Sequence, residues 1–287
     1  MAGELQRLVA EELAQPVDPR VAAMAAAVAA RHGAASRAVL FYGSCLREQQ
    51  LDGLMLDFYL IVSDYRAAYD KPWLARANAL IPPNVFPFQH DGLAAKYAVL
   101  SEADFDRLNG PETRNVSVWA RFAQPSRLAW TANDAASQTA IAAVARAAPT
   151  LLAAAGQVAG EAPLDWWRRA FALTYSAELR AERKGRSGSV VDADADRYAR
   201  FSAPTAAAIE ASAISGGWAR RRIEGKALSV ARLAKASATY AGGADYIVWK
   251  INRHAGTDFV LKPWQRRHPL LGAISLLPRL LRSGAIR

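Results

Sequence analysis

The chain has little cysteine and histidine, and it lacks a long uninterrupted apolar run. The single cysteine, Cys45, excludes an internal disulfide and a zinc cluster, so a reducing compartment is expected. The four histidines are too scattered to form a metal motif. The most apolar, Ala-rich stretches, residues 21–30 and 139–160, are cut short by charged residues. A membrane-spanning helix needs about 20 apolar residues, so both stretches are predicted to be packed helices.

The composition is that of a folded globular protein with an anionic partner. With 287 residues and 52% hydrophobic side chains, the chain is long enough for one large or two modest domains. Its net charge of +10 favours nucleotide, nucleic acid or lipid head groups as partners. The first 20 residues carry acids and lack the basic-then-apolar order of a secretion signal, so this segment is expected to stay with the mature protein.

Residues 38–64 hold the strongest motif in the chain. Two apolar runs, 38–42 and 54–62, are predicted to be buried strands, and Gly43-Ser44 turns the chain between them. A glycine lets backbone N–H groups approach a polyphosphate, and the serine adds a hydroxyl. After twelve intervening residues, Asp57 interrupts the second run. This spacing is typical of a nucleotidyltransferase site, although a glycine-serine turn with one acid also occurs in many α/β proteins.

The usual second acid of such a site is missing, because position 59 is a tyrosine. A second metal ligand must then come from elsewhere, with Asp64 or Asp91 as candidates. Residues 65–88 contain four prolines and are predicted to form a helix followed by an irregular connector. Residues 90–100 return to strand character and include Lys96, which must either extend to water or meet an anion.

Four blocks of sequence, in order, resemble the mitochondrial-type phosphatidate cytidylyltransferases, the translocator assembly and maintenance protein family. The blocks cover about a third of the chain. They are Tyr42-Gly43-Ser44; Met55-Leu56-Asp57-Phe58 with Val62-Ser63-Asp64; Lys96-Tyr97-Ala98-Val99 with Ala120-Arg121 and Gln124-Pro125; and the stretch from Leu173 to Arg180.

The resemblance implies an α+β fold: a polymerase-β-like nucleotidyltransferase domain (1–135), a mainly helical second domain (136–245) and an amphipathic tail (246–287). It implies Mg²⁺-dependent transfer of CMP from CTP to phosphatidate. Tyr42, Gly43, Ser44 and Tyr175 would bind the nucleotide, and Asp57 and Asp64 would hold the metal. The catalytic residues would be Asp57, Lys96, Arg121, Glu178 and Arg180.

The last two catalytic candidates, Glu178 and Arg180, lie within a stretch with helical periodicity, residues 166–186. Taken alone, Tyr175 is a core residue of that helix, and Glu178 and Arg180 are a solvated helix end. Under the resemblance, Arg180 contacts a phosphate, and Glu178 lies near the metal or the base. Further along, a basic run at residues 218–226 precedes a predicted helix at 227–240.

The tail carries most of the excess charge. Residues 250–287 contain eight Lys or Arg and one acid, Asp258. Residues 269–282 are apolar but short and broken by Pro278, a pattern suited to the membrane interface. Trp264 and its neighbouring arginines fit the head-group level, so residues 264–287 are predicted to contact an anionic membrane. The alternative is that the leucines of this segment pack on the protein or on a second subunit.

Three functional hypotheses remain. In the first, the chain is a cytoplasmic nucleotidyltransferase, peripheral on the inner face of the cell membrane, that acts on phosphatidate, another lipid phosphate or a protein hydroxyl. In the second, it is a basic nucleic-acid-binding module on an inactive transferase fold. The position of the basic residues in an apolar tail, rather than among exposed aromatics, disfavours a nucleic-acid partner. In the third, it is a membrane-bound scaffold.

Overall fold

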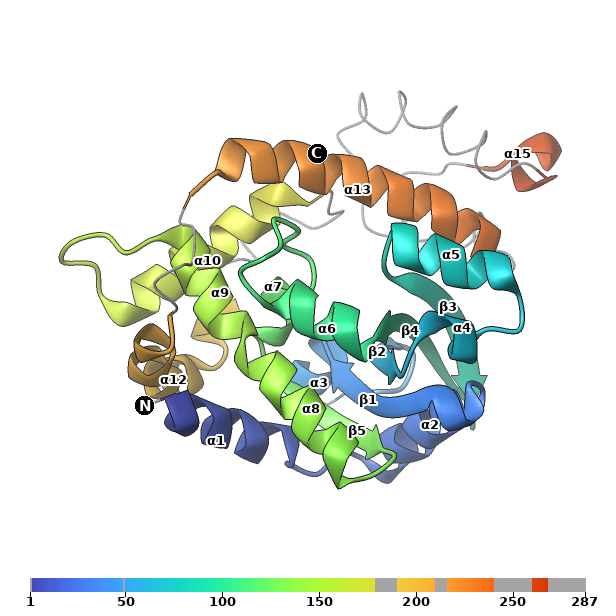
Figure 1. The fold of residues 1–287 in the computed structure, drawn as a ribbon, viewed down its shortest axis with the longest axis horizontal. Coiled ribbons are helices and arrows are strands. Elements are labelled where there is room, and N and C mark those ends of the chain that lie inside the picture. The colour runs from blue at the N-terminus through green and yellow to red at the C-terminus, as the bar shows by residue number, and fades with distance from the viewer. Residues whose placement is uncertain (1, 49, 179–189, 210–215, 240–259, 268–287) are drawn as a thin grey trace.

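The structure is a computed structural model, and it describes residues 2–48, 50–178, 190–209, 216–239 and 260–267. These residues form an α+β fold around a mixed five-stranded sheet, which confirms the predicted class (Figure 1). The strand order is β3-β4-β2-β1-β5. The strands are β1 (Ser36–Tyr42), β2 (Met55–Val62), β3 (Asn84–His90), β4 (Leu93–Ser101) and β5 (Ser126–Thr131). β2 and β4 run parallel, and the other neighbouring pairs are antiparallel.

The central strands bury side chains on both faces of the sheet. Leu40 and Ile61 belong to one hydrophobic cluster, and their neighbours Val39 and Leu60 belong to a second one. Successive side chains of a strand point to opposite faces, so each cluster covers one face. A strand that is covered on both faces reads as a continuous apolar run, which is why the sequence predicted β1, β2 and β4 correctly.

Helices cover both faces of the sheet. The first cluster joins the sheet to α1 (Ala2–Leu13), α6 (Glu102–Asn109), α7 (Trp119–Phe122), α8 (Asp134–Ala145), α9 (Ala147–Ala155), α10 (Pro163–Ala177) and α12 (Ala195–Ala207). The second joins it to α2 (Pro19–Ala30), α4 (Tyr65–Ala68) and α5 (Pro72–Leu80). Two short helices, η1 (Gly33–Ala35) and α3 (Ser44–Glu48), flank β1. The helices predicted at 21–30 and 139–160 are confirmed as α2 and the pair α8 and α9.

The segment predicted to be an irregular connector contains a strand. After α5, residues 84–90 form β3, which pairs with β4 through a two-residue turn at Asp91-Gly92. Both turn residues have positive φ, 46° and 76°, as hairpin turns of this length require. Pro87 was taken as evidence against a strand, but β3 lies at the edge of the sheet, where a proline removes no shared hydrogen bond.

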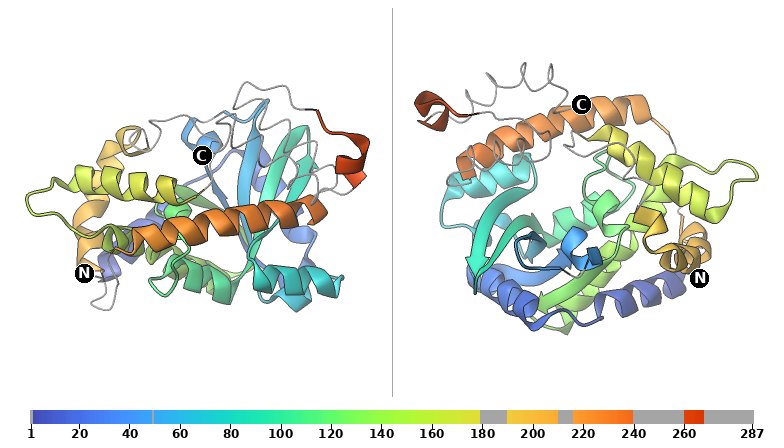
Figure 2. Two further views of the ribbon diagram at one scale, coloured as in Figure 1. Left: turned by 90° about the horizontal axis from the view of Figure 1, so that it is seen from above. Right: turned by 180° about the vertical axis from the view of Figure 1, so that it is seen from behind.

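A long basic helix, α13 (Trp218–Thr239), runs lengthwise from α10 to the β3 edge of the sheet (Figure 2). The sequence placed the start of this helix later, at residue 227. Gly225 permits a close approach to α10, because a Cβ atom there would lie 2.2 Å from the carbonyl oxygen of Ala177. Arg114 and Glu224 add an ion pair of 2.9 Å on the same side. α13 is therefore held against both the helical and the sheet part of the fold.

The domain boundary after residue 135 stays a prediction, and hydrophobic contacts connect the two sides of it. The first cluster contains residues from both sides of the boundary. A buried ion pair also crosses it, because Arg197 of α12 contacts both carboxylate oxygens of Glu12 of α1.

The predicted tail lies largely outside the described residues. The part that is described is the short helix α15 (Pro263–Arg267), in which the side chain of Trp264 is 43% exposed. Within the described ranges, no helix combines the length and apolar character needed to cross a membrane.

Candidate anion-binding site

The Gly43 turn and the Asp57 carboxylate lie in contact. Tyr42, the last residue of β1, is the register partner of Asp57 in the neighbouring strand β2. Gly43 comes next in the chain and therefore lies beside that aspartate. Gly43 has a φ of +97°, a conformation that favours glycine. A Cβ atom at this position would lie 3.0 Å from Asp57 Oδ2. The glycine is therefore required both by its backbone conformation and by the space that the carboxylate takes.

Lys96 neutralises Asp57 from the neighbouring strand. The two residues are register partners in the parallel pair of β2 and β4. Lys96 Nζ lies 2.8 Å from Asp57 Oδ1, and both side chains are about a quarter exposed. This ion pair is the reason for a lysine inside an apolar strand, and it places a cation next to the glycine turn.

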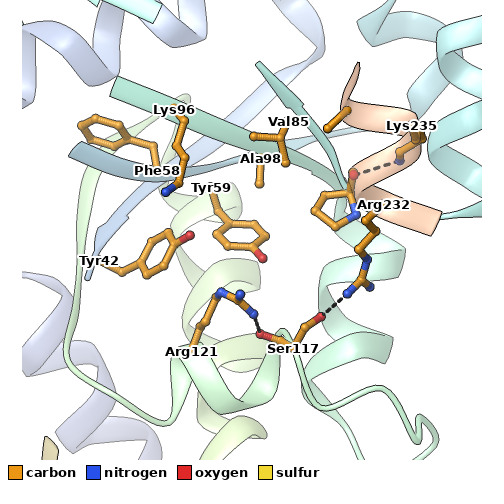
Figure 3. A pocket seen from close by; sticks show the side chains of 12 residues that line it. Tyr42, Phe58, Tyr59, Val85, Lys96, Ala98, Ser117, Arg121, Arg232 and Lys235 are labelled. Carbon is orange, nitrogen blue, oxygen red and sulfur yellow. Dashed lines mark hydrogen bonds between the residues drawn. The ribbon is translucent and has the colours of Figure 1, made fainter. Parts of the chain in front are cut away.

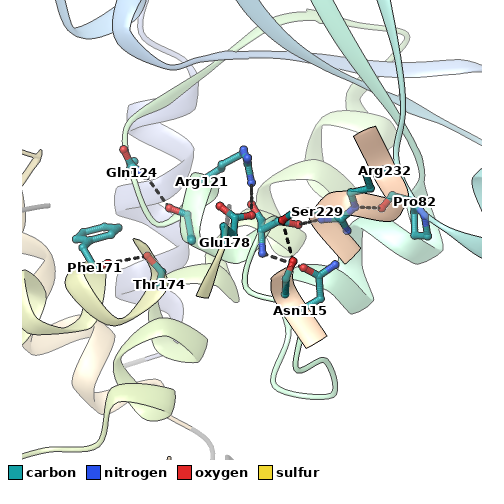
Figure 4. Close-up of polar contacts among 12 residues, drawn as sticks. Pro82, Asn115, Arg121, Gln124, Phe171, Thr174, Glu178, Ser229 and Arg232 are labelled. Atoms are coloured by element: carbon teal, nitrogen blue, oxygen red, sulfur yellow. Dashed lines mark hydrogen bonds and ion pairs between the residues drawn. The ribbon is translucent and has the colours of Figure 1, made fainter. Parts of the chain in front are cut away.

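Arg121 of α7 supplies a second cation, which is held by a nearly buried carboxylate. Its guanidinium donates to the backbone carbonyl of Ser117 and lies 3.4 Å from Glu178 Oε1 (Figure 4). Burial by itself would lower the pKa of Arg121, but the Glu178 carboxylate raises it overall, so the guanidinium stays charged. Glu178 is only 8% exposed and therefore orients Arg121 from inside the protein.

Two tyrosines separate these cations. Burial raises the pKa of both Tyr42 and Tyr59, so both phenols are neutral near pH 7. Their rings lie 5.3 Å apart between centroids, and Phe122 packs against both. Tyr59, which stands where a second acid was expected, gives the site an aromatic wall instead.

These side chains line a cavity of about 160 Å³ that reaches from β2 and β4 to α13 (Figure 3). Its walls also include two basic residues of α13 that the sequence did not single out, Arg232 and Lys235. The lining residues are Tyr42, Phe58, Tyr59, Pro83, Val85, Lys96, Ala98, Ser117, Arg121, Arg232, Lys235 and Ala236. Four cationic side chains thus converge on one cavity.

The two α13 residues hold the prolines before β3. Arg232 Nε donates to the carbonyl of Pro82 at 2.8 Å, and its Nη1 donates to Ser117 Oγ at 2.9 Å. Lys235 Nζ donates to the carbonyls of Ile81 and Pro83. Their spacing of three residues on one helix face was the available sequence signal. The residues that they contact lie about 115 to 154 positions away in the chain, which no local pattern reveals.

Other predicted site residues lie elsewhere. Asp64 caps α4 and accepts hydrogen bonds from the backbone N–H groups of Arg66 and Ala67. A strand advances about 3.3 Å per residue, so the step from Asp57 to Val62 alone spans about 16 Å. Asp64 therefore lies at the opposite end of β2, and the structure does not bring it together with Asp57.

The remaining candidates differ in how much the structure says about them. Asp91 lies in the β3–β4 turn, where it pairs with His90. Ser44 begins α3 directly after Gly43. Tyr175 is half-buried on α10 and packs against the first hydrophobic cluster, and it is not among the cavity-lining residues. Arg180 lies outside the described residues.

The site offers one carboxylate to a metal ion. Magnesium binds through one or two carboxylates together with substrate phosphates and waters. Asp57 fits such a role, because its Oδ2 lies against the turn at which a phosphate would bind. Across the described ranges, no group of three or more His, Cys, Asp or Glu side chains is placed to hold a metal. The residues therefore fit a single-carboxylate site that phosphate oxygens complete.

The fold and the site together describe an α+β protein with a cavity that cationic and aromatic side chains line. No protein-family model matches the chain, and a search of curated proteins finds no match.

Proposed function

We propose that the protein is a nucleotidyltransferase that transfers CMP from CTP to phosphatidate, giving CDP-diacylglycerol and pyrophosphate. The observation that carries the proposal is the contact between the Gly43 turn and Asp57, whose partner Lys96 lines a cationic cavity. A glycine turn beside a carboxylate and a lysine is the arrangement that a polyphosphate and its counter-ion need. The polymerase-β-like fold and the choice of CTP rest on the resemblance of the four sequence blocks.

The residues take distinct roles in this proposal. Gly43 and Ser44 hold the β and γ phosphates through backbone and hydroxyl groups. Lys96 and Arg121 provide fixed positive charge where negative charge develops, which is the main protein contribution to phosphoryl-group transfer. Glu178 positions Arg121 and keeps it charged. Tyr175 on α10 and Arg180 beyond it keep their nucleotide and phosphate roles as expectations from the resemblance.

In the reaction, an oxygen of the phosphatidate phosphate forms a bond to the α-phosphorus of CTP. The bond between that phosphorus and the bridging oxygen breaks in line, and pyrophosphate leaves with the electron pair. Mg²⁺, held by Asp57 and phosphate oxygens, would supply charge neutralisation for the departing pyrophosphate. The protein keeps the reacting groups in place and excludes water from a cavity with aromatic walls.

A nucleic-acid-binding role has less support from the geometry. The cations at the site converge inside a small cavity, whereas a single strand of nucleic acid needs an open groove with exposed aromatic rings. The exposed Val260 and Trp264 in the predicted tail support contact with a membrane surface.

The test is a turnover assay with Mg²⁺, labelled CTP and phosphatidate vesicles, following pyrophosphate and lipid-linked CMP. Asp57→Asn keeps the size of the side chain and removes its charge, so a loss of about 100-fold or more is expected. Asp64→Asn is the matched control, because Asp64 only caps a short helix, and it should keep activity within about twofold of wild type. The absence of turnover in the wild type, or equal turnover by Asp57→Asn, would contradict the proposal.

A further inference from the structure

The α13 end of the cavity carries positive charge that the electrostatic effect of Glu178 on Arg232 does not fully offset, because the pKa of Arg232 remains lowered by burial. In the described part of the chain, Arg232 and Lys235 form no ion pair with an acidic side chain, and their hydrogen bonds go to backbone carbonyls and a serine hydroxyl. Arg232 Nη2 is buried without a hydrogen-bond partner among these residues. A buried cationic donor that lacks a partner costs free energy, and a bound anion removes that cost.

The neighbouring lysine supports the same conclusion. Burial, together with the adjacent Arg232, lowers the pKa of Lys235 to about 7. Two cations on one helix face therefore repel each other inside the protein. A doubly charged anion between them would hold both in the charged state, because an opposite charge within a few ångströms favours ionisation.

The dimensions of the cavity fit phosphate groups, so the rest of a bound nucleotide would extend out of it. Its volume of about 160 Å³ is below the range of about 300 to 1,000 Å³ that is common for small-molecule sites. Ser117 joins the two ends of the cavity, because its carbonyl accepts from Arg121 and its hydroxyl accepts from Arg232. A phosphate bound by Arg232 therefore lies across Ser117 from the guanidinium of Arg121.

We infer that Arg232 and Lys235 form a second phosphate subsite, separate from the Gly43 turn, that binds a phosphate monoester. The inference rests on the proposed function only in naming this phosphate as that of the acceptor. α13 then selects the acceptor by requiring a terminal, doubly charged phosphate. A phosphodiester carries one charge and one more ester bond, so it satisfies fewer of the donors.

The experiment measures equilibrium binding of glycerol 3-phosphate and of CTP to the full chain. Arg232→Gln should weaken glycerol 3-phosphate binding at least 10-fold and leave CTP affinity within twofold. Arg222→Gln is the matched control, because Arg222 is an exposed arginine on the same helix, and it should change neither affinity by more than twofold. Glycerophosphocholine, a phosphodiester, should bind at least 10-fold more weakly than glycerol 3-phosphate.

Arg232→Gln also removes two hydrogen bonds, which by itself weakens folding. A second variant therefore tests the subsite without this loss. Lys235→Met keeps both Arg232 contacts and removes one cation, and it should weaken glycerol 3-phosphate binding about 3- to 10-fold. Thermal unfolding without ligand shows whether each variant is folded. No binding of glycerol 3-phosphate by the wild type, an equal loss in Arg222→Gln, or a loss of CTP affinity alone in Arg232→Gln would overturn the subsite.

A vesicle arm identifies the source of the phosphate. Vesicles of phosphatidylcholine with and without phosphatidate are compared for wild type and Arg232→Gln. Retention that needs both phosphatidate and Arg232 supports the subsite with a lipid acceptor, whereas binding of the soluble ester alone supports it with a soluble acceptor. Because binding needs no turnover, an inactive protein that still binds glycerol 3-phosphate through Arg232 would refute the proposed reaction and leave the subsite standing.

Discussion

The two ends of the cavity hold their cations in different ways. At the strand end, Lys96 lies opposite a carboxylate in a fixed register, so the pair is neutral before any ligand binds. At the helix end, the hydrogen bonds that Arg232 and Lys235 donate within the described residues go to neutral oxygen atoms. The strand end is therefore organised by the protein alone, and the helix end has a charge that a ligand must balance.

The largest effect is expected at the strand end, from Gly43→Ala. The added methyl group would lie 3.0 Å from Asp57 Oδ2, at a φ of +97° that alanine rarely adopts. We expect turnover to fall by about 100-fold and the free energy of unfolding by about 1 to 2 kcal/mol. Steady-state kinetics and urea unfolding measure the two quantities. Gly53→Ala is the control, since it also has a positive φ but no atom within 4 Å of the new Cβ, and it should lose stability without a comparable loss of turnover.

A smaller effect is expected between the two ends, from Glu178→Gln. This change leaves Arg121 without its carboxylate, which should lower the free energy of unfolding by about 1 to 3 kcal/mol and weaken CTP binding about 10-fold. The control is Glu224→Gln, because Glu224 pairs with arginines on the surface, where such contacts contribute about 0 to 1 kcal/mol. Unchanged CTP affinity in Glu178→Gln would show that Arg121 does not contact the nucleotide.

The smallest expected effect is a pH dependence of the free energy of unfolding, caused by Lys235 at the helix end. The pKa of Lys235 is lowered to about 7 from 10.5, so between these values the unfolded chain binds a proton that the folded protein lacks. The contribution of Lys235 to stability should therefore increase as pH rises from 7 towards 10. The charged group that acts on Lys235 is Arg232 of the same helix. The oxygen atoms that accept hydrogen bonds from Lys235 are the backbone carbonyls of Ile81 and Pro83.

As pH rises, the affinity for glycerol 3-phosphate should change in the opposite direction to the stability. Glycerol 3-phosphate should bind more weakly above pH 7, because Lys235 then loses its proton. Both slopes are measured as the difference between wild type and Lys235→Met across this pH range. An identical pH profile for the two proteins would show that Lys235 does not titrate here.

The strand end was predictable from the sequence, and the helix end was not. The apolar runs, the Gly43-Ser44 turn and Asp57 lie within 27 residues of each other, and one strand register brings Lys96 to Asp57. Arg232 reaches the site only because α13 crosses the edge of the sheet and contacts Pro82, 150 positions earlier in the chain. That packing depends on long-range features such as Gly225 against Ala177, which no local periodicity encodes.

Two differences between the expectations from the sequence and the structure have the same kind of cause. β3 was missed because Pro87 was weighed without knowing that the strand lies at an edge. Asp64 was assigned to the metal because it is close to Asp57 in sequence, although an extended strand of this length separates the two ends of β2.

A sequential titration tests whether the protein has two phosphate subsites, one at the Gly43 turn and one on α13. The protein is first saturated with CTP and Mg²⁺ at a temperature that prevents turnover, and glycerol 3-phosphate is then added in a calorimeter. With two subsites, each ligand should bind once, and saturating CTP should change the glycerol 3-phosphate affinity by less than about 10-fold. Mutually exclusive binding, in which glycerol 3-phosphate displaces CTP, would contradict it.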